Sequence, residues 1–118
     1  MIANIEEGGV FAYDFTLIDR DSQPVPLSAM TSLKMTLYDR ATDGIINSRE
    51  EVDILNANGG SFDATSGEGS FTFLAADNPI VTAAKPFETH VALFEAVYAE
   101  GTKNWELRIE VKNLNLVP

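Results

Sequence analysis

The 118-residue sequence contains no cysteine and a single histidine, His90, and both shortages limit its chemistry. Without cysteine the chain forms no disulfide and offers no thiolate ligand or thiol nucleophile. Zinc sites usually combine several Cys or His side chains, which one imidazole does not supply. No nucleophile elbow accompanies His90, so a Ser–His–acid relay is not expected. We therefore predict no catalytic residue, no metal and no cofactor, and we interpret His90 as a surface or interface side chain.

Basic residues are also scarce, with 8 Lys and Arg against 18 Asp and Glu and a formal net charge of −10. Nucleic-acid binding depends on clustered Lys and Arg that neutralise phosphates, and anionic membrane surfaces repel an acidic chain. We therefore expect neither nucleic acid nor a membrane as a partner. The acidic excess either assists docking on a basic partner or is an ordinary solvated surface.

Long apolar runs are absent, since none approaches the roughly 18–20 residues of a membrane span. Residues 1–7 lack the basic start and apolar middle of a signal peptide. We expect a chain that is made in a cytoplasm and used there or assembled there into a larger structure. A length of 118 residues fits one domain over residues 1–118, because about 100–200 residues make a single domain.

Apolar and polar residues do alternate with period two in several segments, which indicates half-buried β-strands. The alternation is clearest in residues 10–17, 32–38, 71–74 and 105–111, and shorter apolar segments lie at 45–46, 52–55 and near Phe62. Stretches rich in Pro, Gly and Asn separate these segments. Short strands with a turn about every ten residues predict an antiparallel β-sandwich.

The segments between and beyond these strands are less regular. Residues 75–80 fit one short helical turn that ends at a proline. The two ends, Met1–Gly9 and Leu114–Pro118, are expected to form short arms. Leu114 and Leu116 make the C-terminal arm apolar enough to dock on a partner.

Residues 88–99 decide the interpretation because their pattern fits two structures. Their Ala, Leu and Glu content, with Gly101 as a C-cap, suits a helix, whereas their aromatic and β-branched residues suit a strand. The clean alternation of residues 105–111 favours a hairpin, most simply one with Gly101 at the left-handed position of a three-residue loop. We therefore predict a strand, with the helix as the alternative.

Both sides of this predicted strand are apolar. With the three-residue loop, Val91 and Leu93 face inward and Phe94 and Tyr98 point outward; a shift of one residue turns Val91 and Leu93 outward instead. In either register an apolar row lies outside the core and forgoes the roughly 1.5–3 kcal/mol gained by burying each large side chain. We expect either another subunit or residues 75–86 to cover this row.

Three weaker patterns have plainer explanations. Asp19–Ser22 resembles part of a calcium loop but lacks its glycine and distal Glu, so we interpret it as a hairpin turn. With 18 acidic residues, carboxylate pairs are unavoidable and say nothing about glycosidase chemistry without geometry. Trp105 beside Tyr98 suits sugar stacking, but Trp105 alternates in step with apolar residues, which favours the core.

The order of the segments resembles a known family. The segments that carry the resemblance are Asp14–Leu17, Pro24–Ser28, Leu33–Asp39, Asn58–Phe62, Gly69–Phe73, Val91–Gly101 and Trp105–Val111. Together they resemble small immunoglobulin-like β-sandwich proteins of tailed bacteriophages, such as the N-terminal domain of baseplate upper proteins and related head- or tail-decorating sandwiches. The resemblance implies an all-β, antiparallel immunoglobulin-like β-sandwich of about 7–8 short strands with a structural role.

The resemblance and the two-sided strand together lead to an expected function. We expect a structural or assembly protein of a bacteriophage virion, assembled in the host cytoplasm, present in several copies or as a homo-oligomer, and bound to other virion proteins rather than acting as an enzyme. The alternative is a carbohydrate-binding module for surface attachment, suggested by exposed aromatic residues. The candidate interface residues are Val91, Leu93, Phe94, Tyr98, Leu114 and Leu116.

Overall fold

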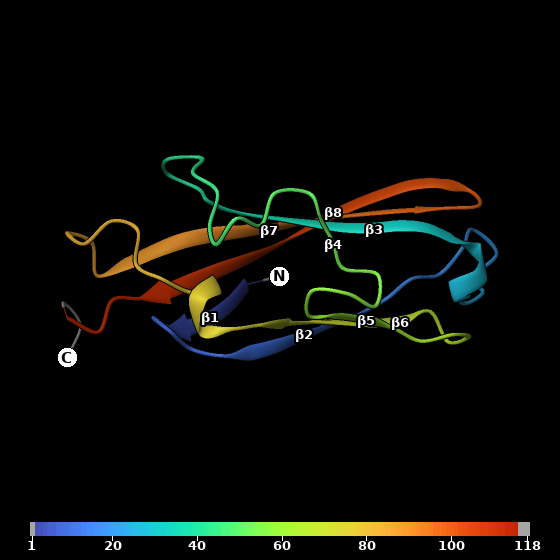
Figure 1. Ribbon diagram of the computed structural model, residues 1–118, viewed down its shortest axis with the longest axis horizontal. Helices are drawn as coiled ribbons and strands as arrows, with labels where there is room; N and C mark the ends of the chain where they lie inside the picture. The colour runs from blue at the N-terminus through green and yellow to red at the C-terminus, as the bar shows by residue number, and fades with distance from the viewer. Residues whose placement is uncertain (1, 116–118) are drawn as a thin grey trace.

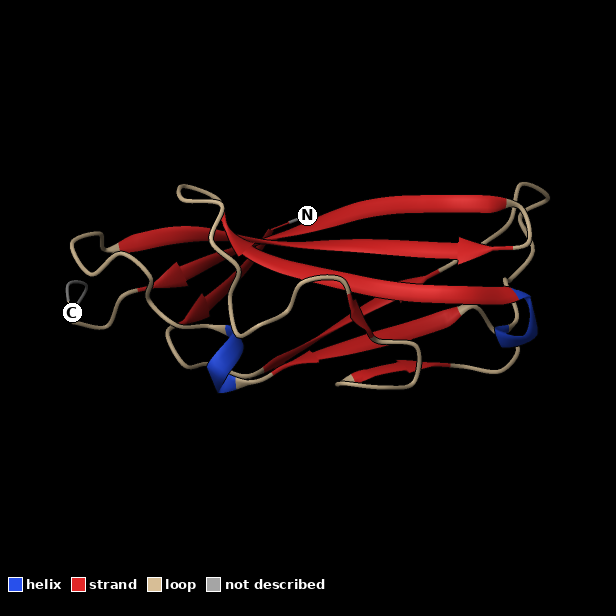
Figure 2. Cartoon of the chain, turned by 45° about the horizontal axis from the view of Figure 1, so that its top comes forward, coloured by secondary structure: helices blue, strands red, loops and turns tan. Residues whose placement is uncertain are grey.

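The alternating segments of the sequence form two packed β-sheets, which the computed structural model describes over residues 2–115 (Figure 1). The strands are β1 (Ile2–Glu6), β2 (Phe11–Thr16), β3 (Met30–Asp39), β4 (Val52–Asp53), β5 (Gly60–Phe62), β6 (Glu68–Phe73), β7 (Phe87–Tyr98) and β8 (Gly101–Lys112). Two short 3-10 turns, η1 (Leu27–Ala29) and η2 (Ala75–Asp77), lie toward opposite ends of the sandwich (Figure 2). The helical turn expected near residues 75–80 is thus confirmed as η2.

The strand order defines the sandwich as immunoglobulin-like. One sheet has the order β1-β8-β7-β3-β4 and the other the order β2-β6-β5. When the strands are lettered along the chain, these sheets correspond to G-F-C-C′ and B-E-D, which is the immunoglobulin arrangement. All strand pairs are antiparallel except β1 and β8, which run parallel. Within residues 2–115, no helix has the length and apolar character required to cross a membrane.

The period-two pattern explains which side chains form the core. Inward-facing residues of β3, β6 and β8 are fully buried between the sheets: Leu33, Met35, Leu37, Phe71, Phe73, Leu107, Ile109 and Val111. The alternate residues of β8, Glu106, Arg108 and Glu110, remain exposed. The strand prediction for residues 105–111 is therefore confirmed together with its dry and charged faces.

Aromatic contacts join the two sheets between β2 and β7. The ring centroids of Tyr13 and Phe15 lie 5.4 and 5.9 Å from that of Phe94. Trp105 stacks on Phe94 at 5.3 Å, and its indole N–H donates a hydrogen bond of 3.2 Å to the Tyr13 hydroxyl. In antibody domains a disulfide joins these same two strands. Because this chain has no cysteine, large aromatic side chains make the corresponding link.

The hairpin between β7 and β8 is tighter than the sequence predicted. Tyr98 pairs with Gly101, so the loop has two residues, Ala99 and Glu100, and the predicted three-residue loop is wrong. The shorter loop shifts the register by one residue, and Phe94 pairs with Trp105. A single-residue shift exchanges the two faces of a strand, which makes this the decisive difference for residues 88–99.

Two further expectations about the chain are corrected. The N-terminal segment is not an arm, because Ile2–Glu6 forms β1 and pairs with Arg108–Lys112 of β8. Its partly buried Ala3 and Ile5 pack against the core, which explains why this segment joins the sheet. The short strand expected at residues 45–46 is only an isolated bridge between Ile45 and Tyr38.

Candidate functional site

The outer face of β7 is the surface that the sequence singled out, and the register settles which residues lie on it. Residues of even number face the core, so Phe94 is fully buried and its predicted outward orientation is wrong. The outer row of β7, as we call it, consists of Val91, Leu93, Glu95 and Val97. An apolar row outside the core is therefore present, in the second of the two registers that the sequence allowed.

The members of the outer row differ in exposure because their neighbours on the sheet differ. Val91 is only 2% exposed and lies in register between Tyr38 and Arg108, two long side chains. Leu93 is 39% exposed and lies between Thr36, which is short, and Glu106, which is itself exposed. Val91 is thus covered within the sheet, and Leu93 is the apolar side chain of the row that remains open to a partner.

The loop that was considered as a cover, residues 75–86, lies elsewhere. The backbone amides of Val81 and Thr82 donate hydrogen bonds to the carboxylate of Glu88, which belongs to the inward face of β7. Asn113 donates to the carbonyl oxygens of Ala83 and Lys85. The loop therefore closes one end of the sandwich and leaves Leu93 uncovered.

The other predicted interface residues fall into four groups. Leu114 is 46% exposed and offers surface to a partner. Tyr98 has the same inward parity as Phe94 and packs partly buried against the core, so its predicted outward orientation is wrong. Leu116 lies outside the described residues. Phe94 and Val91 offer no accessible surface. The interface role of the accessible residues stays a prediction.

A second feature beside Leu93 is an open strand edge on β8. β1 pairs only with Arg108–Lys112, so residues 101–107 have no partner strand on that side within the described chain. The carbonyl oxygen of Lys112 accepts a hydrogen bond from the Glu7 amide, which shows that even-numbered residues of β8 direct their backbone groups away from β7. Because this direction alternates along an antiparallel strand, Asn104 presents its N–H and C=O to the open side.

A buried polar cluster lies on the inward face at the end of the sandwich that the 75–86 loop closes. Asp39 of β3 and His90 of β7 are directly paired, and Glu88 lies two residues before His90. The three side chains are 1%, 0% and 7% exposed in the order Asp39, His90 and Glu88. His90 was expected at a surface or interface, and this expectation is wrong. In the observed register the odd-numbered residues of β7 face outward, so His90 faces the core.

The contacts within this cluster are short and charged. His90 Nε2 lies 2.5 Å from Glu88 Oε2 and 4.0 Å from Asp39 Oδ1. Asp39 Oδ2 accepts hydrogen bonds from the backbone and hydroxyl of Thr42. Burial alone raises the pKa of Glu88, but the Thr82 amide, His90 and the Val81 amide together bring that pKa below its ordinary value. Glu88 is therefore held as a carboxylate.

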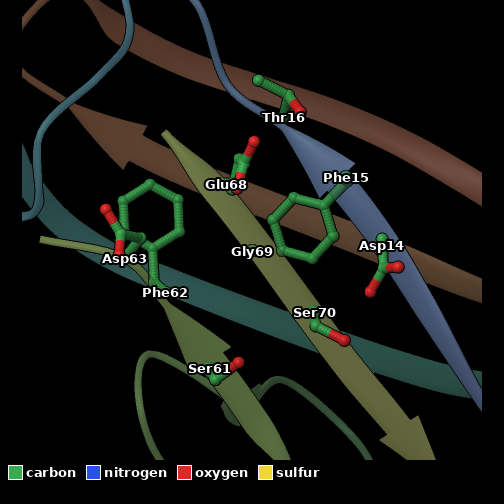
Figure 3. Close-up of a pocket in the computed structure, with 9 residues that line it drawn as sticks. All are labelled: Asp14, Phe15, Thr16, Ser61, Phe62, Asp63, Glu68, Gly69 and Ser70. Atoms are coloured by element: carbon green, nitrogen blue, oxygen red, sulfur yellow. The ribbon is translucent and has the colours of Figure 1, made fainter. Parts of the chain in front are cut away.

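A hollow on the outer face of the three-stranded sheet gathers further acidic groups (Figure 3). Its polar lining comes from all three strands and their flanks: Asp14, Thr16, Ser61, Asp63, Glu68 and Ser70. Asp63 accepts backbone hydrogen bonds from Thr65 and Ser66, which lower its pKa. The carboxylates of Asp14, Asp63 and Glu68 are all exposed to water, and Asp63 is explained by its turn contacts, so we interpret this hollow as a solvated acidic surface.

Two motifs considered in the sequence have structural explanations. The carboxylate of Asp19 accepts hydrogen bonds from the amides of Asp21 and Gln23, so this segment is a turn held by its own side chain. Trp105 is half-buried with its ring stacked on Phe94, and Phe15 lies 5.2 Å away. The indole is therefore occupied by the core rather than presented for sugar stacking.

Comparisons with known proteins add little to this description. No family model matches the sequence, and no curated protein matches it. Among solved structures, the chain is similar to a chimeric titin Z1Z2 functionalized with a KLER exogenous peptide from decorin, at 12% identity and a TM-score of 0.43. The match covers 96% of this chain and 45% of that one, so the chain spans less than half of its length. The immunoglobulin-like assignment comes from the strand order instead.

Proposed function

We propose that the chain is a structural protein of a tailed-bacteriophage virion that acts through protein–protein contacts and not as an enzyme. The observation that carries the proposal is Leu93, a large apolar side chain 39% exposed on a central strand of the five-stranded sheet. A partner that covers this position gains apolar burial that the isolated chain lacks. The resemblance of the segment order to phage sandwiches supplies the virion context.

Two other features support assembly through this region. The open edge of β8 offers unpaired backbone groups, and adding a strand to such an edge is a common mode of protein recognition. The formal net charge of −10 favours a partner with a basic surface. We propose that other virion proteins, or further copies of this chain, dock over Leu93 and along residues 101–107.

The first experiment replaces Leu93 with Asp and uses Asn4→Asp as the matched control. Asn4 is exposed on β1 of the same sheet and lies outside the proposed docking surface, so both variants add one negative charge to an exposed site. Sedimentation velocity and co-sedimentation with purified phage heads and tails measure assembly. We expect L93D to weaken association about tenfold or more and N4D to change it little. A wild-type chain that stays monomeric and binds neither particle contradicts the proposal.

The second experiment separates the strand edge from the apolar face. Asn104→Pro removes a backbone donor on the open side of β8, where proline is tolerated because no ladder hydrogen bond is lost. If partners add a strand at this edge, N104P weakens association while far-UV circular dichroism stays unchanged. Association that survives N104P but not L93D restricts the contact to the face of the sheet.

A further inference from the structure

We propose that Asp39, Glu88 and His90 form a binding site for one divalent transition-metal cation, for which we take Zn²⁺ as the probe. One ligand atom from each of the three side chains lies within 4.8 Å of the others. The three residues belong to β3 and β7, two paired strands in the middle of the sheet, so rigid backbone holds them in place. Such support is what a preorganised site requires.

The charge of the cluster is the first argument for a cation. Two buried carboxylates face one imidazole, so even a protonated His90 leaves one negative charge unmatched. Within residues 2–115, neither Asp39 nor Glu88 forms an ion pair with Lys or Arg, although Arg40 and Lys85 line the adjoining hollow. An unmatched buried charge is costly, and a bound cation removes that cost.

The second argument comes from the imidazole itself. His90 is fully buried, yet its Nδ1 has no hydrogen-bond partner. The other ring nitrogen, Nε2, faces Glu88 and Asp39, so Nε2 is the atom available to a cation. With a cation on Nε2 the proton stays on Nδ1, and this buried N–H then requires a separate water molecule as its partner, because metal-bound imidazoles usually donate their second N–H to an outer group.

Access to the cluster is provided by a hollow of about 370 Å³ on the adjoining surface. Asp39 and Glu88 line this hollow, together with Thr82 of the loop that closes the sandwich. The loop is held to Glu88 by the Val81 and Thr82 amides. A cation thus enters beside the loop without the two sheets separating, which meets the requirement for an entry path.

The chemistry of the three ligands selects the class of metal. Imidazole nitrogen favours Zn²⁺ and its first-row neighbours, whereas sites built only from oxygen favour Mg²⁺ or Ca²⁺. One His and two carboxylates neutralise a divalent ion and leave a fourth position for water. The sequence-based expectation of no zinc site counted only His and Cys as ligands. In the proposed site, the carboxylates of Glu88 on the same strand and of Asp39 on the paired strand take their place.

The test titrates the chelator-treated full chain with ZnCl₂ by calorimetry and follows the imidazole by long-range ¹H–¹⁵N NMR. Because the chain has one His, the ring signals need no assignment. We expect one Zn²⁺ per chain, shifted His90 signals, and loss of about 100-fold or more in affinity in H90Q and in D39N, since even outer contacts of metal ligands contribute 10–100-fold. The control E68Q, in the exposed acidic hollow, retains binding.

Each other outcome overturns the proposal. If the folded wild type binds no Zn²⁺, the site does not exist. If Zn²⁺ binds without changing the imidazole signals, or if E68Q but not D39N weakens binding, the metal binds elsewhere on the chain. If H90Q fails to fold, D39N and the wild-type NMR spectra still decide the result. Mg²⁺ binding in preference to Zn²⁺ contradicts the assigned metal class.

Discussion

Two buried acidic clusters in this sandwich differ in how their charge is matched. Asp77 of η2 is fully buried and receives Arg49, whose Nε and Nη2 lie 2.5 and 3.1 Å from its two oxygens. Asn47 and the Leu74 amide donate further hydrogen bonds to it. The cluster of Asp39, Glu88 and His90 contains two carboxylates and only an imidazole beside them.

The difference between the clusters separates a structural site from a candidate ligand site. At Asp77 every charge has a protein partner, and the Arg49 guanidinium also lies 5.1 Å from the centre of the Phe71 ring. This cluster ties the loop after β3 to the turn after β6. The second cluster keeps an unmatched charge and an unpartnered nitrogen, so its contacts are complete only with a further group.

Among substitutions in the two clusters, we expect Asp77→Asn to lower the free energy of unfolding the most. The substitution leaves the Arg49 guanidinium, on a side chain that is only 11% exposed, without its counter-charge. Breaking a buried ion pair in this way typically costs about 3–5 kcal/mol. Urea unfolding followed by far-UV circular dichroism measures the free energy of unfolding. A loss below about 1 kcal/mol would mean that water, rather than Asp77, satisfies Arg49.

The second effect is acid destabilisation through the same residue. Burial by itself raises the pKa of Asp77, but hydrogen bonds from Arg49, Asn47 and the Leu74 amide bring it below its ordinary value of 3.8. A carboxyl group with a depressed folded pKa contributes stability that is complete above its unfolded pKa and is lost as pH falls through the folded pKa.

The free energy of unfolding of the wild type should therefore fall below pH 3.8 more steeply than that of D77N. Urea titrations at a series of acidic pH values measure both slopes. Equal slopes in the two proteins would assign the acid sensitivity to other carboxylates.

The smallest effect is expected for Asp39→Asn in metal-free protein, and this variant is the matched partner of D77N. Asn retains an oxygen that accepts the Thr42 hydrogen bonds, and the change removes one of two neighbouring buried negative charges. We expect a change within about 1 kcal/mol, because a lost charge contact and a relieved repulsion offset each other. A loss as large as that of D77N would show that Asp39 is fully paired without a metal.

Local pattern predicted much of the fold, and pairing geometry decided what it missed. Residues 105–111 gave the strand and its faces because one side is apolar and the other charged. Residues 88–99 are apolar on both sides, so nothing in their pattern distinguishes the inward face. The two-residue loop at Ala99 and Glu100 makes that choice and buries Phe94 and His90.

The sequence did not predict the cluster of Asp39, Glu88 and His90, and the reason is again strand pairing. Asp39 and His90 are separated by about half of the chain, and only the register of β3 against β7 brings them together. Acidic residues are abundant in this sequence, so no single Asp or Glu stood out as a ligand. One sequence pattern did point to a buried polar pair. Glu88 and His90 lie on the same side of the strand as the apolar Ala92 and Phe94 that follow them.

The position of Trp105 gives the protein an intrinsic optical probe. It is the single tryptophan of the chain, and it contacts Phe94 in one sheet and, through its indole N–H, Tyr13 in the other. Its fluorescence emission therefore reports whether the two sheets remain in contact. Separation of the sheets exposes the indole to water and shifts the emission to longer wavelength, so opening of the sandwich is detectable without an attached label.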